Sequence, residues 1–162
     1  MFLVTIEFDI MELDVLDKKI LRIISCNAKT PFLEIARECG VSGAAIHQRV
    51  QKLTNGGIIQ GSEYVLDTHK LGYQTCAFLG VVLKDLSYFE EVVTQIKLIP
   101  EVVECHYAIG KYAMFIKVYA KNNKHLLQII LEQIGTIKGI LTTETFQVSL
   151  DEIFKRQILI QP

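Results

Sequence analysis

Hydrophobic residues recur at helical spacing near the start of the chain. Asp14 stands ahead of the first such stripe and Asp17 follows three residues later, which is the spacing of a helix-capping pair. We therefore predict a first helix that starts after Asp14 and ends near Cys26-Asn27. Its buried face is the apolar stripe formed by Leu16, Ile20, Ile23 and Ile24.

Two shorter amphipathic segments follow, separated by a tight turn. We expect Thr30 to cap the first of them and Gly40 to end it, because glycine takes the left-handed conformation at little cost. Ser42 caps the second, and Gly56-Gly57 stops it. Their buried faces are Ile35, Ala36 and Cys39 in one and Ile46, Val50 and Leu53 in the other. Such a pair is typical of a helix-turn-helix unit, whose second helix enters the DNA major groove.

The outward face of the second helix of this pair is polar and small. Gln48 and Gln51 lie opposite its apolar stripe, and glutamine amides can pair with adenine. Arg49 stands at the edge of the stripe, where it reaches a phosphate or an acidic neighbour rather than a base. An ordinary two-helix hairpin with a solvated face is the alternative interpretation. The candidate DNA-contacting residues are Ser42, Ala44, His47, Gln48, Arg49, Gln51 and Lys52.

From about residue 74 the pattern changes to strands that alternate with helices. We expect strands over 74–83, 101–109, 112–119 and 140–150, with Gly110-Lys111 as a tight hairpin turn. A helix capped by Ser87 is expected over 87–98, and another over 124–134. The inward residues of the latter are Leu126, Leu127, Ile130 and Ile134. Segments 58–66 and 153–160 are candidate additional strands.

The order strand-helix-strand-strand-helix-strand predicts a ferredoxin-like βαββαβ domain. It requires an antiparallel sheet with both helices on one face, and the sheet of a second subunit is the simplest cover for the other. The predicted class is α+β, with an N-terminal winged helix-turn-helix domain. We expect an extension over 1–10, the DNA-binding domain over 11–60, a linker strand over 61–73 and the ferredoxin-like domain over 74–162.

Composition adds an argument for assembly. Half of the 162 residues are hydrophobic and the mean hydropathy is +0.30, which is high for two small domains. The net charge is −1, and residues 11–60 hold seven Lys or Arg against five Asp or Glu. Because affinity for phosphate grows with the number of contacts, one copy should bind DNA weakly. We therefore expect a homodimer or a larger homo-oligomer.

Several classes of chemistry find no support in the sequence. The four cysteines, Cys26, Cys39, Cys76 and Cys105, are far apart and accompany no histidine cluster. They indicate reduced thiols in a cytoplasmic protein, with no metal site and no cofactor. No segment approaches the roughly 18 apolar residues of a membrane span. No nucleophile-base-acid set or phosphate-binding loop is present, so we do not expect an enzyme.

The motifs in order resemble the Lrp/AsnC family of feast/famine transcription regulators, from about Leu13 to Leu150. Each motif is weak alone, but together and at this spacing they are specific. In the first half they are Leu13-Asp14-x-x-Asp17-x-x-Ile20-Leu21, Leu33-x-Ile35-Ala36-x-x-Cys39-Gly40-Val41-Ser42, Arg49-Val50-x-x-Leu53, Gly57-Ile58-Ile59-x-Gly61 and Leu71-Gly72. In the second half they are Val102-Val103-Glu104-Cys105-His106, Gly110-x-Tyr112 and Gly139-Ile140-x-Thr142-Thr143-x-Thr145.

The resemblance implies a sequence-specific regulator that binds double-stranded DNA. Family members dimerise through their sheets, often form octamers, and many bind an amino acid or a related small molecule between dimers. The implied effector-binding residues are Gly110, Lys111, Tyr112, Ala113, Thr143 and Thr145. The alternative is a small-molecule-sensing oligomer that resembles ACT domains and does not bind DNA.

One departure from the family pattern concerns the effector. Ala113 stands where the family commonly has an acid, which would balance the ammonium group of an amino acid. Glu144 alternates with Thr143 and Thr145 along a strand, so it should point away from a pocket that they line. Glu101 and Glu104 remain alternative sources of the charge. We expect amino acids to bind weakly or not at all.

Overall fold

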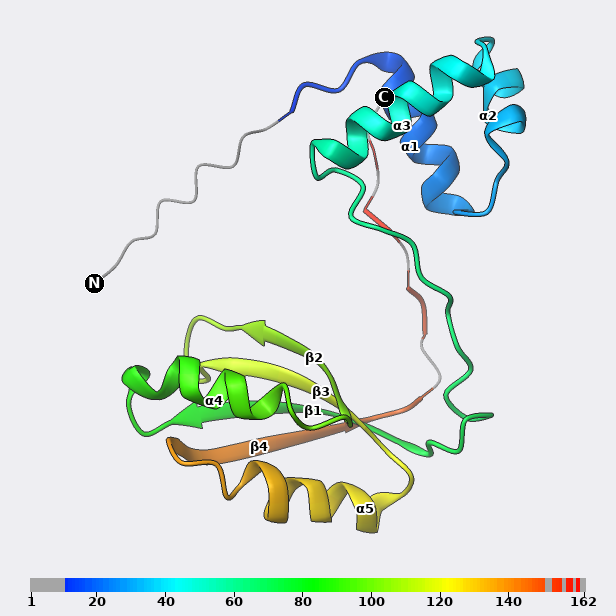
Figure 1. Cartoon of the computed structure of the whole chain (residues 1–162). Helices are drawn as coiled ribbons and strands as arrows, with labels where there is room; N and C mark the ends of the chain where they lie inside the picture. Colours follow the sequence, from blue (N-terminus) through cyan, green and yellow to red (C-terminus); the bar gives the residue numbers. More distant parts are fainter. Residues whose placement is uncertain (1–10, 151–152, 156, 159, 161–162) are drawn as a thin grey trace. The chain divides into compact units, whose positions relative to one another are not determined.

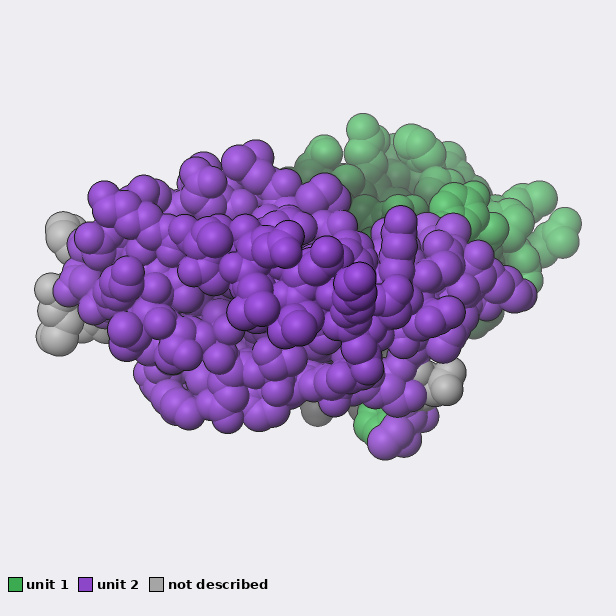
Figure 2. All heavy atoms as spheres, turned by 90° about the horizontal axis from the view of Figure 1, so that it is seen from below, with its two compact units in different colours: residues 1–64, 154–162 green, residues 65–153 purple. Residues whose placement is uncertain are grey.

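The computed structural model describes residues 11–150, 153–155, 157, 158 and 160 (Figure 1). The extension over 1–10 lies outside the described residues. The chain divides into two compact units, residues 1–64 with 154–162 and residues 65–153, which Figure 2 shows in different colours. Within the described residues no helix is both long and apolar enough to cross a membrane.

The first unit contains helices α1 (Val15–Cys26), α2 (Phe32–Cys39) and α3 (Gly43–Asn55). The capping box predicted at the start of α1 is confirmed, since Asp17 N donates to Asp14 Oδ1 at 2.8 Å. Gly40 ends α2 with a left-handed φ of 70°, and the Ser42 hydroxyl accepts from Ala45 N at the start of α3. The three helices share one core, which is built around Ile20, Ile35, Ala36 and Ile46.

Two local predictions for the first unit are wrong. Thr30 does not cap α2, because Pro31 occupies the capping position and the Thr30 hydroxyl donates instead to Asn27 O at 2.9 Å. No strand forms over 58–66 or in the linker over 61–73. Ile58 N and Ile59 N both donate to Leu53 O at the end of α3, and the residues after them have no neighbouring strand to pair with.

The second unit is the ferredoxin-like domain that the pattern predicted. Its elements are β1 (Thr75–Leu83), the short 3-10 turn η1 (Leu86–Tyr88), α4 (Phe89–Ile96), β2 (Val102–Tyr107), β3 (Met114–Ala120), α5 (Asn123–Gln128), η2 (Ile129–Ile134) and β4 (Ile140–Val148). The sheet order is β2-β3-β1-β4 and every neighbouring pair is antiparallel. Successive side chains along each strand therefore point to opposite faces of one sheet.

Both helices cover the same face of this sheet. Alternate residues of β1 and β3, such as Leu79 and Ile116, are fully buried against Val92 of α4 and Ile129 of the α5–η2 segment. Among the described residues of this unit, no helix or strand covers the opposite face. Its residues from β1, β3 and β4 include Cys76, Phe78, Val82, Phe115, Lys117, Tyr119, Phe146 and Val148.

Four details of this unit differ from the prediction. Asp85 rather than Ser87 is the cap, since Asp85 Oδ1 accepts from Ser87 N at 2.8 Å. The connection between β2 and β3 spans residues 108–113 and is closed by Ala108 N donating to Ala113 O, so it is no two-residue turn. The described residues of 153–160 form no strand, because from Phe154 the chain belongs to the first unit.

The fourth difference is the second helix of this unit, which changes form midway. α5 continues as the π-helix η2, whose wider turns shift the phase of the residues. Leu126 and Ile129, three residues apart, are buried, and Ile134 is buried five residues further on, whereas Leu127 is 55% exposed. The expectation that Leu127 faces inward is wrong.

Candidate functional site

The outer face of α3 is the first candidate site. Ile46 and Leu53 bury the opposite side of the helix, as the apolar stripe predicted. His47 is exposed but packs edge-on against the Phe32 ring of α2, with 6.0 Å between ring centroids. The exposed residues of the predicted set are Ser42, Ala44, His47, Gln48, Gln51 and Lys52, while Arg49 is half-buried. The face offers small residues, two amides and an imidazole.

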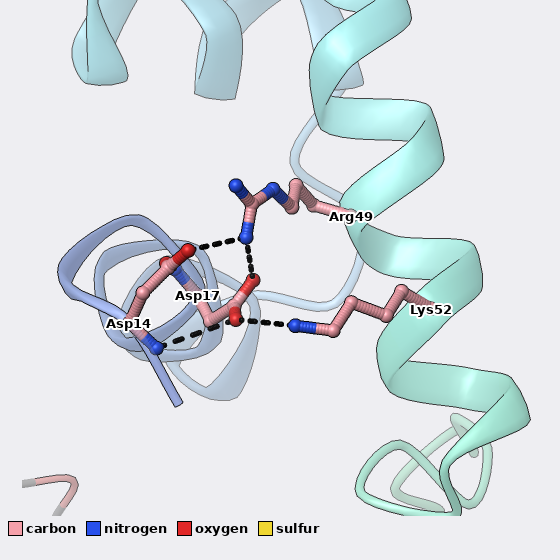
Figure 3. A network of polar contacts seen from close by, with 4 residues as sticks. All are labelled: Asp14, Asp17, Arg49 and Lys52. Carbon is pink, nitrogen blue, oxygen red and sulfur yellow. Dashed lines mark hydrogen bonds and ion pairs between the residues drawn. The ribbon is translucent and has the colours of Figure 1, made fainter. Parts of the chain in front are cut away.

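The two cations of α3 are bound to α1 rather than free in solvent (Figure 3). The Asp17 carboxylate is fully buried, and its oxygens accept from Arg49 Nη1 and Lys52 Nζ, each at 3.2 Å. Arg49 also donates to Asp14. Of the two partners that the sequence offered to Arg49, the structure selects the acidic neighbour.

The electrostatics around Asp14 and Arg49 favour the charged form of these two side chains. The backbone N–H of Asp17 and the Arg49 guanidinium hold the pKa of the Asp14 carboxyl below its usual value. In turn, the Asp14 carboxylate raises the pKa of Arg49. Sequence analysis assigned Asp17 only a capping role. The missed signal is the spacing of Arg49 and Lys52, which places two cations on one side of the helix.

The second candidate site is the loop over 108–113. It borders a cavity of about 230 Å³ whose walls also include Val82, Leu83 and Leu86. Gly110 has a φ of 136°, a conformation that L side chains rarely adopt, so this position requires glycine. Ala113 N donates to Val81 O at 2.9 Å and thereby fixes the end of the loop on the sheet.

The structure divides the predicted effector residues between two faces of the sheet. Thr143 and Thr145 pair in register with Val81 and Leu79, which point toward the helices. Glu144 therefore points the other way, as expected. That face, however, is the one on which Lys111 and Tyr112 meet Glu144. Within one chain, Thr143 and Thr145 do not converge with Lys111 and Tyr112.

Glu144 is held tightly on its face. Lys111 Nζ lies 2.6 Å from Glu144 Oε2, which also accepts from the Tyr112 hydroxyl. The Tyr112 ring lies over Gly80, where an added Cβ would come within 2.6 Å of the ring. The Lys111 ammonium, followed by the Tyr112 hydroxyl, lowers the pKa of Glu144. Sequence analysis missed this contact because it depends on the register of β4 against β1.

The other acids considered as counter-charges are engaged elsewhere. Glu104 Oε1 and Oε2 lie 3.2 Å from Lys117 Nζ and 3.1 Å from His106 Nε2. Glu101 lies 3.6 Å from the His125 ring. Among the residues that the structure describes, no group of three His, Cys, Asp or Glu could hold a metal ion.

Comparisons with known proteins find matches for both units of the chain. The family model of the AsnC-type helix-turn-helix domain matches residues 13–54, and that of the Lrp/AsnC ligand binding domain matches residues 76–159. The regulatory protein AsnC of Haemophilus influenzae is 38% identical over 90% of this chain and 97% of its own length. The HTH-type transcriptional regulator FL11 of Pyrococcus horikoshii is 36% identical over 84% of this chain and 89% of its own.

A solved structure extends the similarity to the fold. The structure of Escherichia coli AsnC matches with a TM-score of 0.84 and 34% identity, covering 91% of this chain and 99% of that one. The match includes the helix-turn-helix unit and the four-stranded sheet, and the relatives are regulators rather than enzymes. The chain belongs to the Lrp/AsnC family of DNA-binding transcriptional regulators.

Proposed function

We propose that the protein binds specific DNA sequences as a homodimer or a higher homo-oligomer, with α3 in the major groove. The observation that carries this proposal is the outer face of α3, where Gln48 and Gln51 are exposed and the helix starts with the small residues Gly43, Ala44 and Ala45. Their amides suit the donor-acceptor pattern of adenine. A regulator of this kind works where the chromosome lies, so we place it in the cytoplasm.

Substitution of Gln48 tests the base-reading role. Gln48→Ala should weaken binding to a specific site by about 1–3 kcal/mol and leave binding to random DNA nearly unchanged. A gel shift compares the upstream region of the protein's own gene with random DNA of equal length. Gln128→Ala is the matched control, because Gln128 is also an exposed helical glutamine but lies in the second unit. An equal loss on both DNAs would reject the base-reading role.

The open face of the sheet supports the proposed dimer. Aromatic side chains of three strands, including Phe78, Phe115 and Phe146, share this face, and such a surface is normally covered. A second copy presents the same face and offers a self-complementary cover. Octamers of four dimers are the further assembly that we propose from the family resemblance.

A small-molecule effector is the second part of the proposal, located at the loop over 108–113. The match to a ligand-binding domain over 76–159 supports it. We expect common amino acids to bind weakly, although a carboxylate does lie near the loop. Glu144 is already paired with Lys111, so the ammonium group of a ligand would have to displace the lysine. Calorimetric titration tests this, and micromolar affinity for any common amino acid would contradict it.

The alternative of an ACT-like sensor without DNA binding has less support. The helix-turn-helix unit is complete in its three helices, its turn and its core. The absence of any shift with specific or random DNA, for a folded oligomeric protein, would restore that alternative.

A further inference from the structure

We propose that Arg49 and Lys52 are positioning residues in DNA binding, which hold α3 against the carboxylate of Asp17 and do not contact phosphate. This inference rests on the proposed function, since it takes α3 as the helix that meets DNA. It differs from the ordinary assumption that cations on such a helix bind the DNA backbone.

The burial of Asp17 is the first reason. Its side chain is fully buried, and a buried carboxylate is costly unless charges and hydrogen bonds compensate it. Both of its oxygens are bound by α3, one by Arg49 Nη1 and the other by Lys52 Nζ, each at 3.2 Å. If Arg49 or Lys52 left Asp17 in order to bind a DNA phosphate, the buried charge of Asp17 would be less compensated.

The geometry of the contacts is the second reason. Arg49 and Lys52 are three residues apart, so α1 holds α3 at two points on successive turns (Figure 3). Two points of attachment fix both the rotation of the helix and its position along its axis. Gln48 and Gln51 each directly precede one of these cations. The rotation set by the cations therefore determines where the two amides point.

The charge balance is the third reason. Asp14, Asp17, Arg49 and Lys52 form a cluster of two acids and two bases with no net charge. α3 contains no other Lys or Arg. The cluster therefore adds nothing to the attraction between the protein and DNA at long range. The amides of α3 supply recognition, and cations elsewhere in the protein supply the salt-dependent part of the affinity.

The experiment measures DNA affinity of the full chain at several salt concentrations, for Lys52→Gln, Lys52→Arg and the unmodified protein. We expect Lys52→Gln to lower the affinity for the specific site about tenfold, because one base contact would no longer be aligned. Affinity for random DNA should change little. The dependence of log K on log salt should keep its slope. Lys52→Arg should restore specific binding, because arginine keeps the charge and the reach to Asp17.

Control variants separate a positioning role of Lys52 from a phosphate contact and from a general effect of removing a lysine. Lys124→Gln removes an exposed lysine in the second unit and should change neither quantity. If Asp17→Asn folds, adding Lys52→Gln to it should cause no further loss, because the two residues act through one contact. Lys52→Gln alone still decides the matter where Asp17→Asn does not fold.

Two results would overturn the proposal. A slope that flattens by about 0.9 for each lysine removed, with equal loss on all DNA, would show a phosphate contact. Specific binding that stays unchanged while only the melting temperature falls would show a purely structural role. Failure of the proposed function looks different: the unmodified protein would then bind the specific site no more tightly than random DNA.

Discussion

Asp14 performs two tasks with one carboxylate. One oxygen accepts the backbone N–H of Asp17 at 2.8 Å and caps α1, and the other accepts from Arg49 of α3. Both interactions are stronger with the ionised form, which is why the pKa of Asp14 lies below its ordinary value of 3.8. A single residue thus links the start of one helix to the flank of another.

The acid dependence of stability follows from this lowered pKa. The stability that the Asp14 carboxylate contributes is fully present at pH values above 3.8, where the unfolded chain also has this carboxyl ionised. It is lost as the pH falls through the lower pKa of Asp14 in the folded protein. We expect Asp14→Asn to be less stable at neutral pH and to lose less stability on acidification. Thermal unfolding between neutral and acidic pH measures both. Glu63→Gln, an exposed acid of the same unit, is the control. Parallel acid curves for the unmodified protein and Asp14→Asn would contradict the assignment.

Lys111 is positioned to compete with the ammonium group of a ligand for the carboxylate of Glu144. This carboxylate lies beside the loop over 108–113, which borders the cavity, but Lys111 Nζ is already 2.6 Å from Glu144 Oε2. Removing the ammonium with Lys111→Met should expose Glu144 to the ammonium group of a ligand. We expect the variant to bind amino acids more tightly than the unmodified protein in calorimetric titrations. The double variant Lys111→Met with Glu144→Gln should lose the gain, and a gain that persists there would assign it to another group.

At the scale of elements, local features of the sequence were sufficient to predict most helices and strands. Asp14, Gly40 and Ser42 are caps whose chemistry is local, so the ends of the first-unit helices follow from a few neighbouring residues. The alternation of strands and helices likewise predicted the βαββαβ order. Thr30 was assigned wrongly because Asn27 competes for its hydroxyl, a contact outside the helix pattern.

The candidate sites were less predictable because they depend on non-local pairing. The period of two along β4 shows that Glu144 opposes Thr143, but not which face carries the loop of Lys111. The ion pairs of Asp17 likewise join α1 to residues more than thirty positions later. Residue types thus predicted which segments form each candidate site, whereas packing decided which partners meet.

The burial pattern of the α5–η2 segment leads to a prediction about core packing. Ile129 is fully buried in the core cluster and Leu127 is 55% exposed. Ile129→Ala should therefore lower the free energy of unfolding by about 2–5 kcal/mol, from lost burial and the cavity that remains. Leu127→Ala is the matched control, with an expected change within about 0.5 kcal/mol. Chemical denaturation measures both, and a larger loss for Leu127→Ala would contradict this helical phase.

At the scale of the whole molecule, the open sheet face explains the high hydrophobic content. It combines aromatic residues of β1, β3 and β4 with two charged groups of these strands: Glu144, which is paired with Lys111, and Lys117, whose side chain is only 12% exposed. Lys117 Nζ lies 3.2 Å from Glu104 and above the rings of Phe78 and Tyr119. Because its charge is already balanced, a second subunit can cover this face without burying an unpaired ion.

Phe146 provides the sharpest test of this interface. It pairs in register with Phe78 on the open face and is 43% exposed in the single chain. Phe146→Glu should leave the fold intact, because glutamate can reach solvent from this edge strand. In a dimer joined through this face, however, the new carboxylate would be buried beside apolar groups. We expect sedimentation to give the mass of one chain, 18.4 kDa, for this variant and a multiple for the unmodified protein. Leu98→Glu, an exposed leucine after α4, should keep the assembly. A Phe146→Glu variant that assembles as the unmodified protein does would show that another surface joins the subunits.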